Sequence, residues 1–347
     1  MSNSCYMNAV FQVMVEMSST IVFLDLFSLS TAWSTYDLVR DCVQVIAHTP
    51  PLAYMILRSE LEDVEGNESG FNQTVKKIIA FLLKPTTDET CLSLESVKAV
   101  FGEKFNGLAQ ECADEFLMYI FEMMEHKDGS KWKHSPLGII KCSLRLQHKC
   151  QCGEPRSSHL DDYTVLSLAG NLKDRDSNNL EQMIKDYFEP QTLGTDSLLA
   201  CTKCHQKGLC ISQTQLAEIG TVLIITIRCY DENGKKILLS PIAVEEELSI
   251  QQSHGTTDLI LTGIVYHQGR SVKSGHYFSI FRGPGNQWFQ ANDKKVIPVD
   301  GPRPSKSSNS TPFILTYTRK DQVPESLHTA LGRLASTVDI SNLQIIR

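Results

Sequence analysis

The N-terminal part of the chain carries apolar residues at helical spacing. Between Met7 and Met14 they recur every three or four positions, which places them on one face of a helix. The same spacing is stronger over Ala113–Met124 and weaker over residues 36–47 and 72–83. These patterns predict a helical region that ends near residue 130, where a polar stretch interrupts them.

After residue 140 the apolar pattern changes to a period of two. Short strands are predicted around Leu144–Leu146 and Val165–Leu168, with one helix over Leu180–Phe188. Strands then dominate to residue 320, and residues 321–347 are expected to form a partly helical tail. The order of helices, mixed region and strands indicates an α+β fold. The predicted later strands are Val222–Ile227, Leu259–His267, Tyr277–Phe281, Trp288–Ala291 and Phe313–Thr318.

Composition narrows the function classes. The chain has 347 residues, a net charge of −7 and 11 cysteines. No apolar run reaches the roughly 20 residues of a membrane span, and the first residues do not form a signal peptide, so no membrane partner is expected. The acidic balance argues against nucleic acid. Many cysteines without a secretion signal indicate a reducing compartment, the cytoplasm or the nucleus.

Cys5 is the candidate nucleophile because it directly precedes the first helical stretch. Unpaired backbone N–H groups and the helix dipole at such a position stabilise a thiolate. The thiolate also needs a base close by. The alternative for Cys5 alone is a buried structural thiol, which is common for free cysteine.

His276 is the candidate base, since it follows Gly275 at the start of a predicted strand. A catalytic imidazole needs a carbonyl or carboxylate oxygen on its other nitrogen, and Asn292 or Asp293 on the neighbouring strand could supply it. An isolated histidine is more often structural. His267, on the preceding strand, is the competing histidine.

Two close pairs of cysteines form a candidate metal site. Four thiolates suit Zn²⁺ in a tetrahedral structural site, and the metal would stabilise a strand region with little core of its own. His148 is a possible substitute ligand. A redox pair or plain structural thiols are the alternatives. The predicted ligands are Cys150, Cys152, Cys201 and Cys204.

Two segments together resemble the signature boxes of the ubiquitin-specific protease family. Residues 3–12 resemble its Cys box, and the stretch from Gly275 to Val296 resembles its His box. By this resemblance Cys5 is the nucleophile, His276 the base, Asn292 the third member of the triad and Asp293 an adjacent supporting acid. His267 matches an upstream strand position and is not expected to be catalytic.

The resemblance implies a papain-like cysteine protease that hydrolyses the isopeptide or peptide bond after the C-terminal glycine of ubiquitin. It covers residues 1–320: a helical thumb over about 1–130, zinc-ribbon fingers over about 140–220 and a β-sheet palm over about 221–320. The partners would be ubiquitin and ubiquitinated proteins. The sequence does not specify which chain linkage or substrate protein is used.

A third segment, residues 110–117, resembles the family's middle box. By resemblance its polar members would hold the two arginines of ubiquitin's tail, as carboxylates do through charge-assisted hydrogen bonds. Cys112 and Asp114 depart from the usual Asp and His/Gln, which leaves open whether the modifier is ubiquitin or a relative. A solvated acidic helix face is the plain alternative. The expected substrate-binding residues are Gln110, Glu111, Asp114 and Glu115.

The chain begins inside the Cys box. The family places an Asn of the oxyanion hole five residues before the nucleophile, a position that this sequence does not have before Cys5. Loss of one such donor costs about 10²–10³ in rate. We therefore expect weakened activity, with a fragment of a longer protein as one reason. The alternative is a catalytically weak or inactive ubiquitin-binding module with the same fold.

Overall fold

A computed structural model represents the protein, and the residues it describes start at Ile46. Cys5, Gln110, Glu111 and Asp293 lie outside the described residues. No helix in the described part is long and apolar enough to cross a membrane. The described ranges are 46–58, 61–62, 70–83, 91–92, 113–126, 131–132, 136–169, 179–193, 201–205, 210–231, 233–237, 242–271, 274–292, 295–304, 310–323, 326–340 and 345–346.

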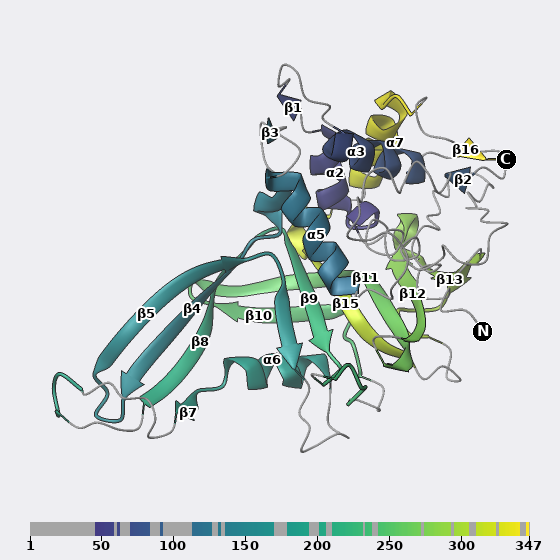
Figure 1. The fold of residues 1–347 in the computed structure, drawn as a ribbon. Helices are drawn as coiled ribbons and strands as arrows, with labels where there is room; N and C mark the ends of the chain where they lie inside the picture. The colour runs from purple at the N-terminus through teal and green to yellow at the C-terminus, as the bar shows by residue number, and fades with distance from the viewer. Residues whose placement is uncertain are drawn as a thin grey trace.

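Four helices gather at one end of the molecule (Figure 1). They are α2 (Pro50–Arg58), α3 (Gly70–Leu82), α5 (Ala113–His126) and α7 (Ser326–Thr337). The apolar stripe predicted on α5 is buried, with Phe116, Leu117 and Ile120 at 0 % exposure. Helix α7 packs against α2 and α3, and its Leu331 and Ala335 enter the same core. Two short antiparallel pairs lie nearby: β1 (Leu61–Glu62) with β3 (Lys131–Trp132), and β2 (Cys91–Leu92) with β16 (Ile345–Ile346).

The largest sheet, which we call the palm, has the strand order β14-β13-β12-β11-β15-β9-β6, with β10 paired to β11. Only the β6–β9 pair is parallel among these pairings. The strands are β6 (Leu166–Ala169), β9 (Val222–Arg228), β10 (Glu247–Gln252), β11 (Gly255–Ser271), β12 (Ser274–Arg282), β13 (Trp288–Asn292), β14 (Lys295–Val299) and β15 (Ser310–Arg319).

The central strands of the palm are buried on both faces. Every residue of Val222–Ile227 and of Ser310–Thr318 is buried. A continuous apolar run such as β9 is typical of a strand that is covered on both sides. Threonines in this core bond to each other, as Thr262 Oγ1 and Thr316 Oγ1 do at 3.0 Å. Each fully buried large aliphatic side chain contributes about 1.5–3 kcal/mol, so burial of apolar side chains is a large source of stability for the palm.

A second sheet, which we call the fingers, projects away from the palm and the helices (Figure 1). Its strand order is β5-β4-β8-β7. Strand β5 is largely exposed, and most of the residues in the middle of β4 and β8 are only half-buried. The strands are β4 (Cys142–Cys150), β5 (Pro155–Tyr163), β7 (Gln191–Leu193) and β8 (Cys210–Ile219).

Helix α6 (Leu180–Phe188) lies beside both sheets and contacts β6 and β8. The side chain of Asn179 caps its N-terminus by accepting a 2.7 Å hydrogen bond from the backbone N–H of Gln182. An ion pair of 2.8 Å joins Glu181 and Lys185 one turn apart. The sequence predicted this helix with the same bounds.

Candidate active site and cysteine cluster

His276 and Asn292 meet at one edge of the palm. The Nε2 atom of His276 lies 2.6 Å from Oδ1 of Asn292, and both side chains are half-buried. Of the two residues that the sequence alone allowed as orienter, Asn292 therefore contacts the imidazole. Its neighbour Asp293 is outside the described residues.

The strand register brings these two side chains together. Ser279 on β12 pairs with Ala291 on β13, so Phe278 lies opposite Asn292. His276 precedes Phe278 by two residues on β12 and therefore projects from the same face as Phe278. The rings of His276 and Phe278 stack with centroids 6.3 Å apart. A rigid sheet thus fixes both members of the pair.

The contact also determines which nitrogen of His276 carries hydrogen. An amide oxygen only accepts hydrogen bonds, so Nε2 of His276 is the donor to Asn292. In the neutral ring this leaves the lone pair on Nδ1. Such a ring can take a proton from a thiol that approaches Nδ1.

His267 occupies a different environment from His276. Its side chain is 0 % exposed and contacts the hydroxyl of Tyr230 through Nδ1. Burial, with smaller contributions from Lys236 and His276, lowers the pKa of His267 to about 3. A buried imidazole that stays neutral at neutral pH cannot exchange protons with a substrate. This environment suits a structural or indirect role better than that of the base.

Two of the expected substrate-binding residues are described, and both lie in the first turn of α5. Asp114 is half-buried and Glu115 is exposed. The carboxylate of Asp114 accepts a 2.9 Å hydrogen bond from the backbone N–H of Glu115. This arrangement places negative charge at a helix N-terminus, where the dipole stabilises it. Gln110 and Glu111 fall outside the described residues.

The four predicted cysteine ligands come together at the end of the fingers. Their sulfur atoms all lie within 4.8 Å of one another. Sγ of Cys150 is 3.6 Å from Sγ of Cys204, and Sγ of Cys152 is 3.6 Å from Sγ of Cys201. This group could hold a metal ion. His148 is not part of it, since its Nδ1 bonds Oγ of Ser157 at 2.9 Å.

Tight turns hold each pair of cysteines. The turn between β4 and β5 uses Gly153, whose φ of +86° suits glycine. A backbone hydrogen bond lowers the pKa of the Cys150 thiol to about 6. Backbone hydrogen bonds from Cys204 and Lys203 likewise lower the pKa of the Cys201 thiol. Thiolates are therefore favoured at Cys150 and Cys201, whereas burial and the three neighbouring thiols raise the pKa of the Cys152 thiol to about 11, so a bound cation would be needed to hold it deprotonated.

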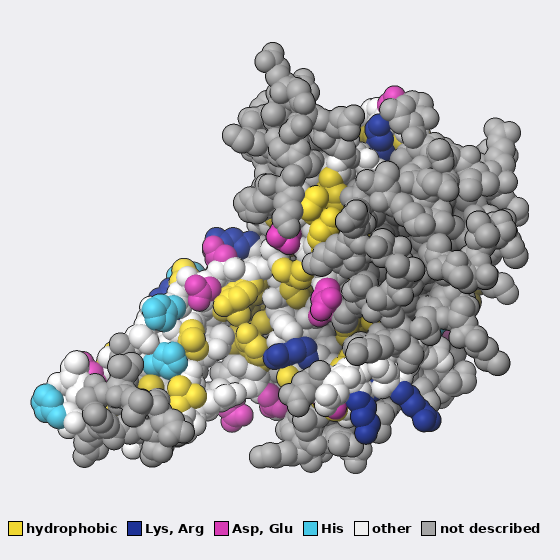
Figure 2. All heavy atoms as spheres, viewed as in Figure 1, with side chains coloured by type: hydrophobic (Ala, Val, Ile, Leu, Met, Phe, Trp, Pro, Cys, Tyr) yellow, Lys and Arg dark blue, Asp and Glu magenta, His cyan; other side chains and the backbone are white. Residues whose placement is uncertain are grey.

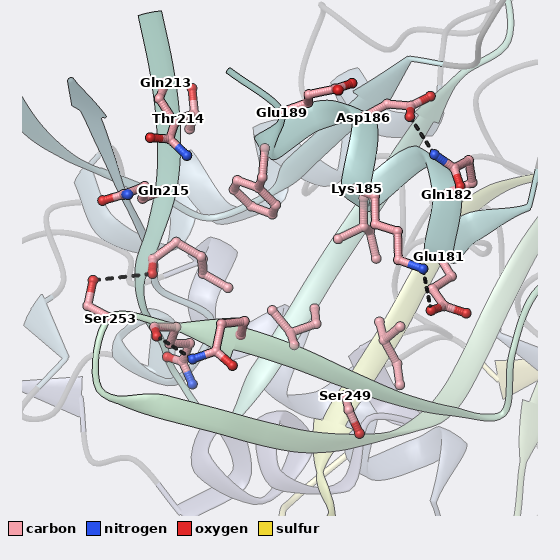
Figure 3. Close-up of a pocket in the computed structure, with 17 residues that line it drawn as sticks. Glu181, Gln182, Lys185, Asp186, Glu189, Gln213, Thr214, Gln215, Ser249 and Ser253 are labelled. Atoms are coloured by element: carbon pink, nitrogen blue, oxygen red, sulfur yellow. Dashed lines mark hydrogen bonds and ion pairs between the residues drawn. The ribbon is translucent and has the colours of Figure 1, made fainter. Parts of the chain in front are cut away.

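A hollow of about 860 Å³ lies elsewhere, between α6, β8 and the β10–β11 hairpin (Figure 3). Charged side chains of α6 line one side of it, among them the Glu181–Lys185 pair. Glutamine and serine side chains line the strand sides. Of the candidate catalytic and metal-binding residues that the structure describes, none borders this hollow.

The sequence profile described as ubiquitin carboxyl-terminal hydrolase matches residues 39–317. That range includes His276, Asn292 and the four clustered cysteines. The chain belongs to the ubiquitin carboxyl-terminal hydrolase family. The recognition made from the Cys and His boxes is thereby confirmed.

Curated relatives of this ubiquitin carboxyl-terminal hydrolase family member have low sequence identity to it but align with most of its length. Ubiquitin carboxyl-terminal hydrolase 17-like protein B of Mus musculus is 22 % identical over 318 residues, which cover 87 % of this chain and 66 % of that protein. Ubiquitin carboxyl-terminal hydrolase 25 of Arabidopsis thaliana is 23 % identical over 326 residues, 86 % of this chain and 48 % of that protein. The chain spans about half to two thirds of the length of these relatives.

Solved structures show the same fold. The SAGA DUB module Ubp8/Sgf11/Sus1/Sgf73 bound to monoubiquitin matches with a TM-score of 0.66 and 19 % identity, over 87 % of this chain and 70 % of that chain. This likeness confirms the predicted fold class of this hydrolase family member: an α+β fold with a helical thumb, a β-sheet palm, and fingers whose cysteine cluster could form a zinc ribbon.

Proposed function

We propose that this chain is a thiol-dependent deubiquitinase that cleaves the bond after the C-terminal glycine of ubiquitin. The observation that carries the proposal is the 2.6 Å contact between Nε2 of His276 and Oδ1 of Asn292. It fixes Nε2 on the side of Asn292, and in the proposal Nδ1 is the nitrogen that receives the thiol proton. Cys5 supplies that thiol in the proposal, because its sequence surroundings resemble the family's Cys box.

The proposed reaction has two steps. Nδ1 of His276 takes the proton of the Cys5 thiol, and the thiolate attacks the glycine carbonyl carbon. The tetrahedral intermediate collapses to a thioester while the imidazolium gives its proton to the leaving amine. Water then attacks the thioester with the imidazole as base, which frees the ubiquitin carboxylate and restores the thiol. Asn292 stabilises the imidazolium and holds its orientation throughout.

Negative charge at the start of α5 supports ubiquitin as the partner. Asp114 and Glu115 would pair with basic side chains of the modifier's tail through charge-assisted hydrogen bonds. Substituting Glu115 with Gln should raise KM for ubiquitin substrates more than it lowers kcat, since these contacts would bind the ground state and the transition state alike. Ubiquitinated proteins are the expected substrates.

We further propose that the cysteine cluster binds Zn²⁺ as a structural ion. A Zn–S distance of about 2.3 Å in a tetrahedron separates the sulfurs by about 3.8 Å. The Cys150–Cys204 and Cys152–Cys201 sulfur–sulfur distances, both 3.6 Å, fit this geometry closely. With four protein ligands no open position remains, so Zn²⁺ would stabilise the fingers and take no part in the hydrolysis.

Covalent labelling tests the proposed function directly. Ubiquitin with an electrophilic group at its C-terminus should form an adduct with Cys5, identified by peptide mass spectrometry. Cys5→Ala should abolish the adduct and retain ubiquitin binding. His276→Ala should slow labelling because the thiol loses its base. Folded protein that binds ubiquitin but neither reacts with the probe nor hydrolyses a fluorogenic ubiquitin substrate would instead be a binding module.

A further inference from the structure

The backbone that carries His276 is packed from behind by the ring of His267. His276 projects from one face of β12, so Gly275 and Tyr277 project from the other. His267 on β11 pairs directly with Tyr277, and their ring centroids are 4.4 Å apart. The buried imidazole of His267 therefore lies under the residues on either side of His276.

Gly275 has to be glycine because of this ring. A methyl group at Gly275 would overlap Nε2 of His267 and would lie 2.7 Å from its Cε1 atom. The backbone oxygen of Gln268 would be 2.8 Å from the same methyl group. The φ angle of Gly275 does not require glycine, since it is outside the left-handed range. The ring of His267 limits the space beside Gly275. It therefore determines how closely β12 can approach β11 at this point.

The position of the His267 ring depends in turn on Tyr230. The Tyr230 hydroxyl contacts Nδ1 of His267, whereas Nε2 has no hydrogen-bond partner in the described part of the chain. The other neighbours of the ring are aromatic: Tyr277 and Phe313 pack against it with centroids 4.4 and 6.4 Å away. Aromatic packing allows a ring to slide or tilt, whereas a hydrogen bond fixes one atom.

We propose that Tyr230 and His267 are a positioning pair that holds the backbone at Gly275 and so sets the location of the His276 imidazole relative to Asn292. The inference rests on the proposed function, because it concerns the base of the same site. Both residues would act through the backbone at Gly275 and not on the reacting atoms themselves. Tyr230 reaches the site from the segment that follows β9, so the pair connects two other parts of the chain, this segment and β11, to the strand that carries the base.

The charge state of the pair suits a fixed support. Lys236 and His276 are the charged or titratable groups whose fields act on His267, and both disfavour its protonation, as burial does. The His267 ring therefore stays neutral while His276 changes its protonation during the reaction. A supporting residue that gained charge near His276 would shift the pKa of the base. A neutral ring only fixes the position of the base.

Tyr230→Phe removes the hydroxyl and keeps the ring. Tyr266→Phe is the matched control, since Tyr266 lies on β11, is buried, and donates its own hydroxyl to the backbone oxygen of Pro302 at 2.6 Å. With a fluorogenic ubiquitin substrate, Tyr230→Phe should lower kcat about ten-fold with KM within two-fold, because small misplacements of a catalytic group are costly. Tyr266→Phe should leave kcat within two-fold.

A second measurement does not need turnover. Proton–nitrogen spectra of ¹⁵N-histidine-labelled protein, assigned with His276→Ala, report which nitrogen of His276 carries hydrogen and at what pH the ring titrates. The unsubstituted chain should show the Nε2–H form. Tyr230→Phe should mix the two forms and shift the titration, and Tyr266→Phe should not.

The two measurements separate the two hypotheses. Absence of turnover in the unsubstituted chain would count against the proposed function, while the spectra would still test the positioning pair. The pair is overturned if the His276 signals of Tyr230→Phe match those of the unsubstituted chain, or if Tyr266→Phe changes them equally. The positioning pair is supported if tyrosine is the only residue tested at position 230 that gives the normal His276 spectrum.

Discussion

The palm and the fingers are both antiparallel over most of their strands, yet different interactions hold them together. The palm strands β9 and β15 are buried along almost their whole length. In the fingers β5 is largely exposed, and four cysteines gather at the far end. Figure 2 shows histidines and charged side chains, with hydrophobic ones between them, on the visible face of the fingers.

This difference explains where each kind of chemistry is placed. A base must keep its orientation within a fraction of an ångström, and a sheet with two buried faces provides that rigidity for His276 and Asn292. A thin sheet cannot bury enough apolar surface for the same purpose, so a cross-link at its end is needed. The fingers should therefore depend on metal, and the palm should not.

Removal of one thiolate from the fingers should have the largest effect. Cys201→Ser should abolish tight zinc binding, since structural sites contribute about 10–16 kcal/mol of apparent binding energy. Hydrogen exchange should then rise over β4, β5 and β8 and stay low over β9 and β15. Metal analysis and exchange mass spectrometry on the same sample measure both effects.

Cys210→Ser is the control for this substitution. Cys210 is buried and pairs in register with Cys150, but its sulfur is outside the cluster. It should retain one zinc per chain and normal exchange. Equal loss of protection in the palm and the fingers of Cys201→Ser would show that the palm depends on the metal as much as the fingers do.

Removal of the base from the palm should have the next largest effect. His276→Ala should lower kcat/KM about 10³-fold, because the thiol loses its proton acceptor. Zinc content and the exchange of the fingers should not change. The control is His148→Ala in the fingers, whose imidazole bonds Ser157 at 2.9 Å and should leave kcat/KM within two-fold. A comparable loss in both variants would contradict the assignment of the base to the palm.

Much of the contrast between the buried palm and the cysteine-bearing fingers could be predicted from the sequence. The continuous apolar run of β9 indicated a buried strand, and the spacing on α5 indicated a helix with one buried face. The four cysteines of the cluster followed from their pairing along the chain. The contact of Asn292 with His276 required two strands in register, and the family resemblance selected Asn292 over Asp293 where the residues alone did not.

Other elements had no signal in the pattern. Strand β5 reads Pro-Arg-Ser-Ser-His-Leu-Asp-Asp-Tyr and lacks apolar alternation because neither face meets the core. Helix α2 begins with two prolines and is too short for a clear period, although six of its residues are buried. The contact between Tyr230 and His267 joins segments that are far apart in sequence, and no local pattern reports such a pair.

The buried histidine of the palm gives a pH-dependent prediction. The folded pKa of His267 is about 3, below the value of about 6.5 in an unfolded chain, so the unfolded state binds more protons between these values. His267 therefore lowers the stability as pH falls below 6.5. Between pH 6.5 and 5 the palm should lose about 1.5 kcal/mol from this group alone.

The measurement is hydrogen exchange of β11 and β12 peptides in increasing urea at the two pH values. His267→Gln should be less stable at pH 6.5 and should lose less than the unsubstituted chain on acidification. His254→Gln changes an exposed histidine in the turn between β10 and β11 and should keep the original dependence. An identical pH dependence in all three proteins would mean that His267 is not held neutral by the fold.

The smallest expected effect concerns the surface where α5 meets the fingers. Met118 is 42 % exposed and lies one turn after Asp114, on the same side of the helix. Its sulfur accepts a 3.5 Å hydrogen bond from Thr164, just beyond the end of β5. An exposed apolar side chain next to the proposed binding carboxylates suits contact with the body of ubiquitin.

Met118→Asp should therefore weaken binding of ubiquitin by about 1 kcal/mol, roughly five-fold in Kd, through lost apolar contact and added charge. Ile297→Asp is the matched control, because Ile297 is 47 % exposed on β14 in the palm. Each substitution is combined with Cys5→Ala to prevent turnover, and calorimetric titration with ubiquitin then measures the Kd of each variant. If Ile297→Asp weakens binding as much as Met118→Asp does, the effect is not specific to the α5 surface, and the assignment of ubiquitin contact to Met118 is wrong.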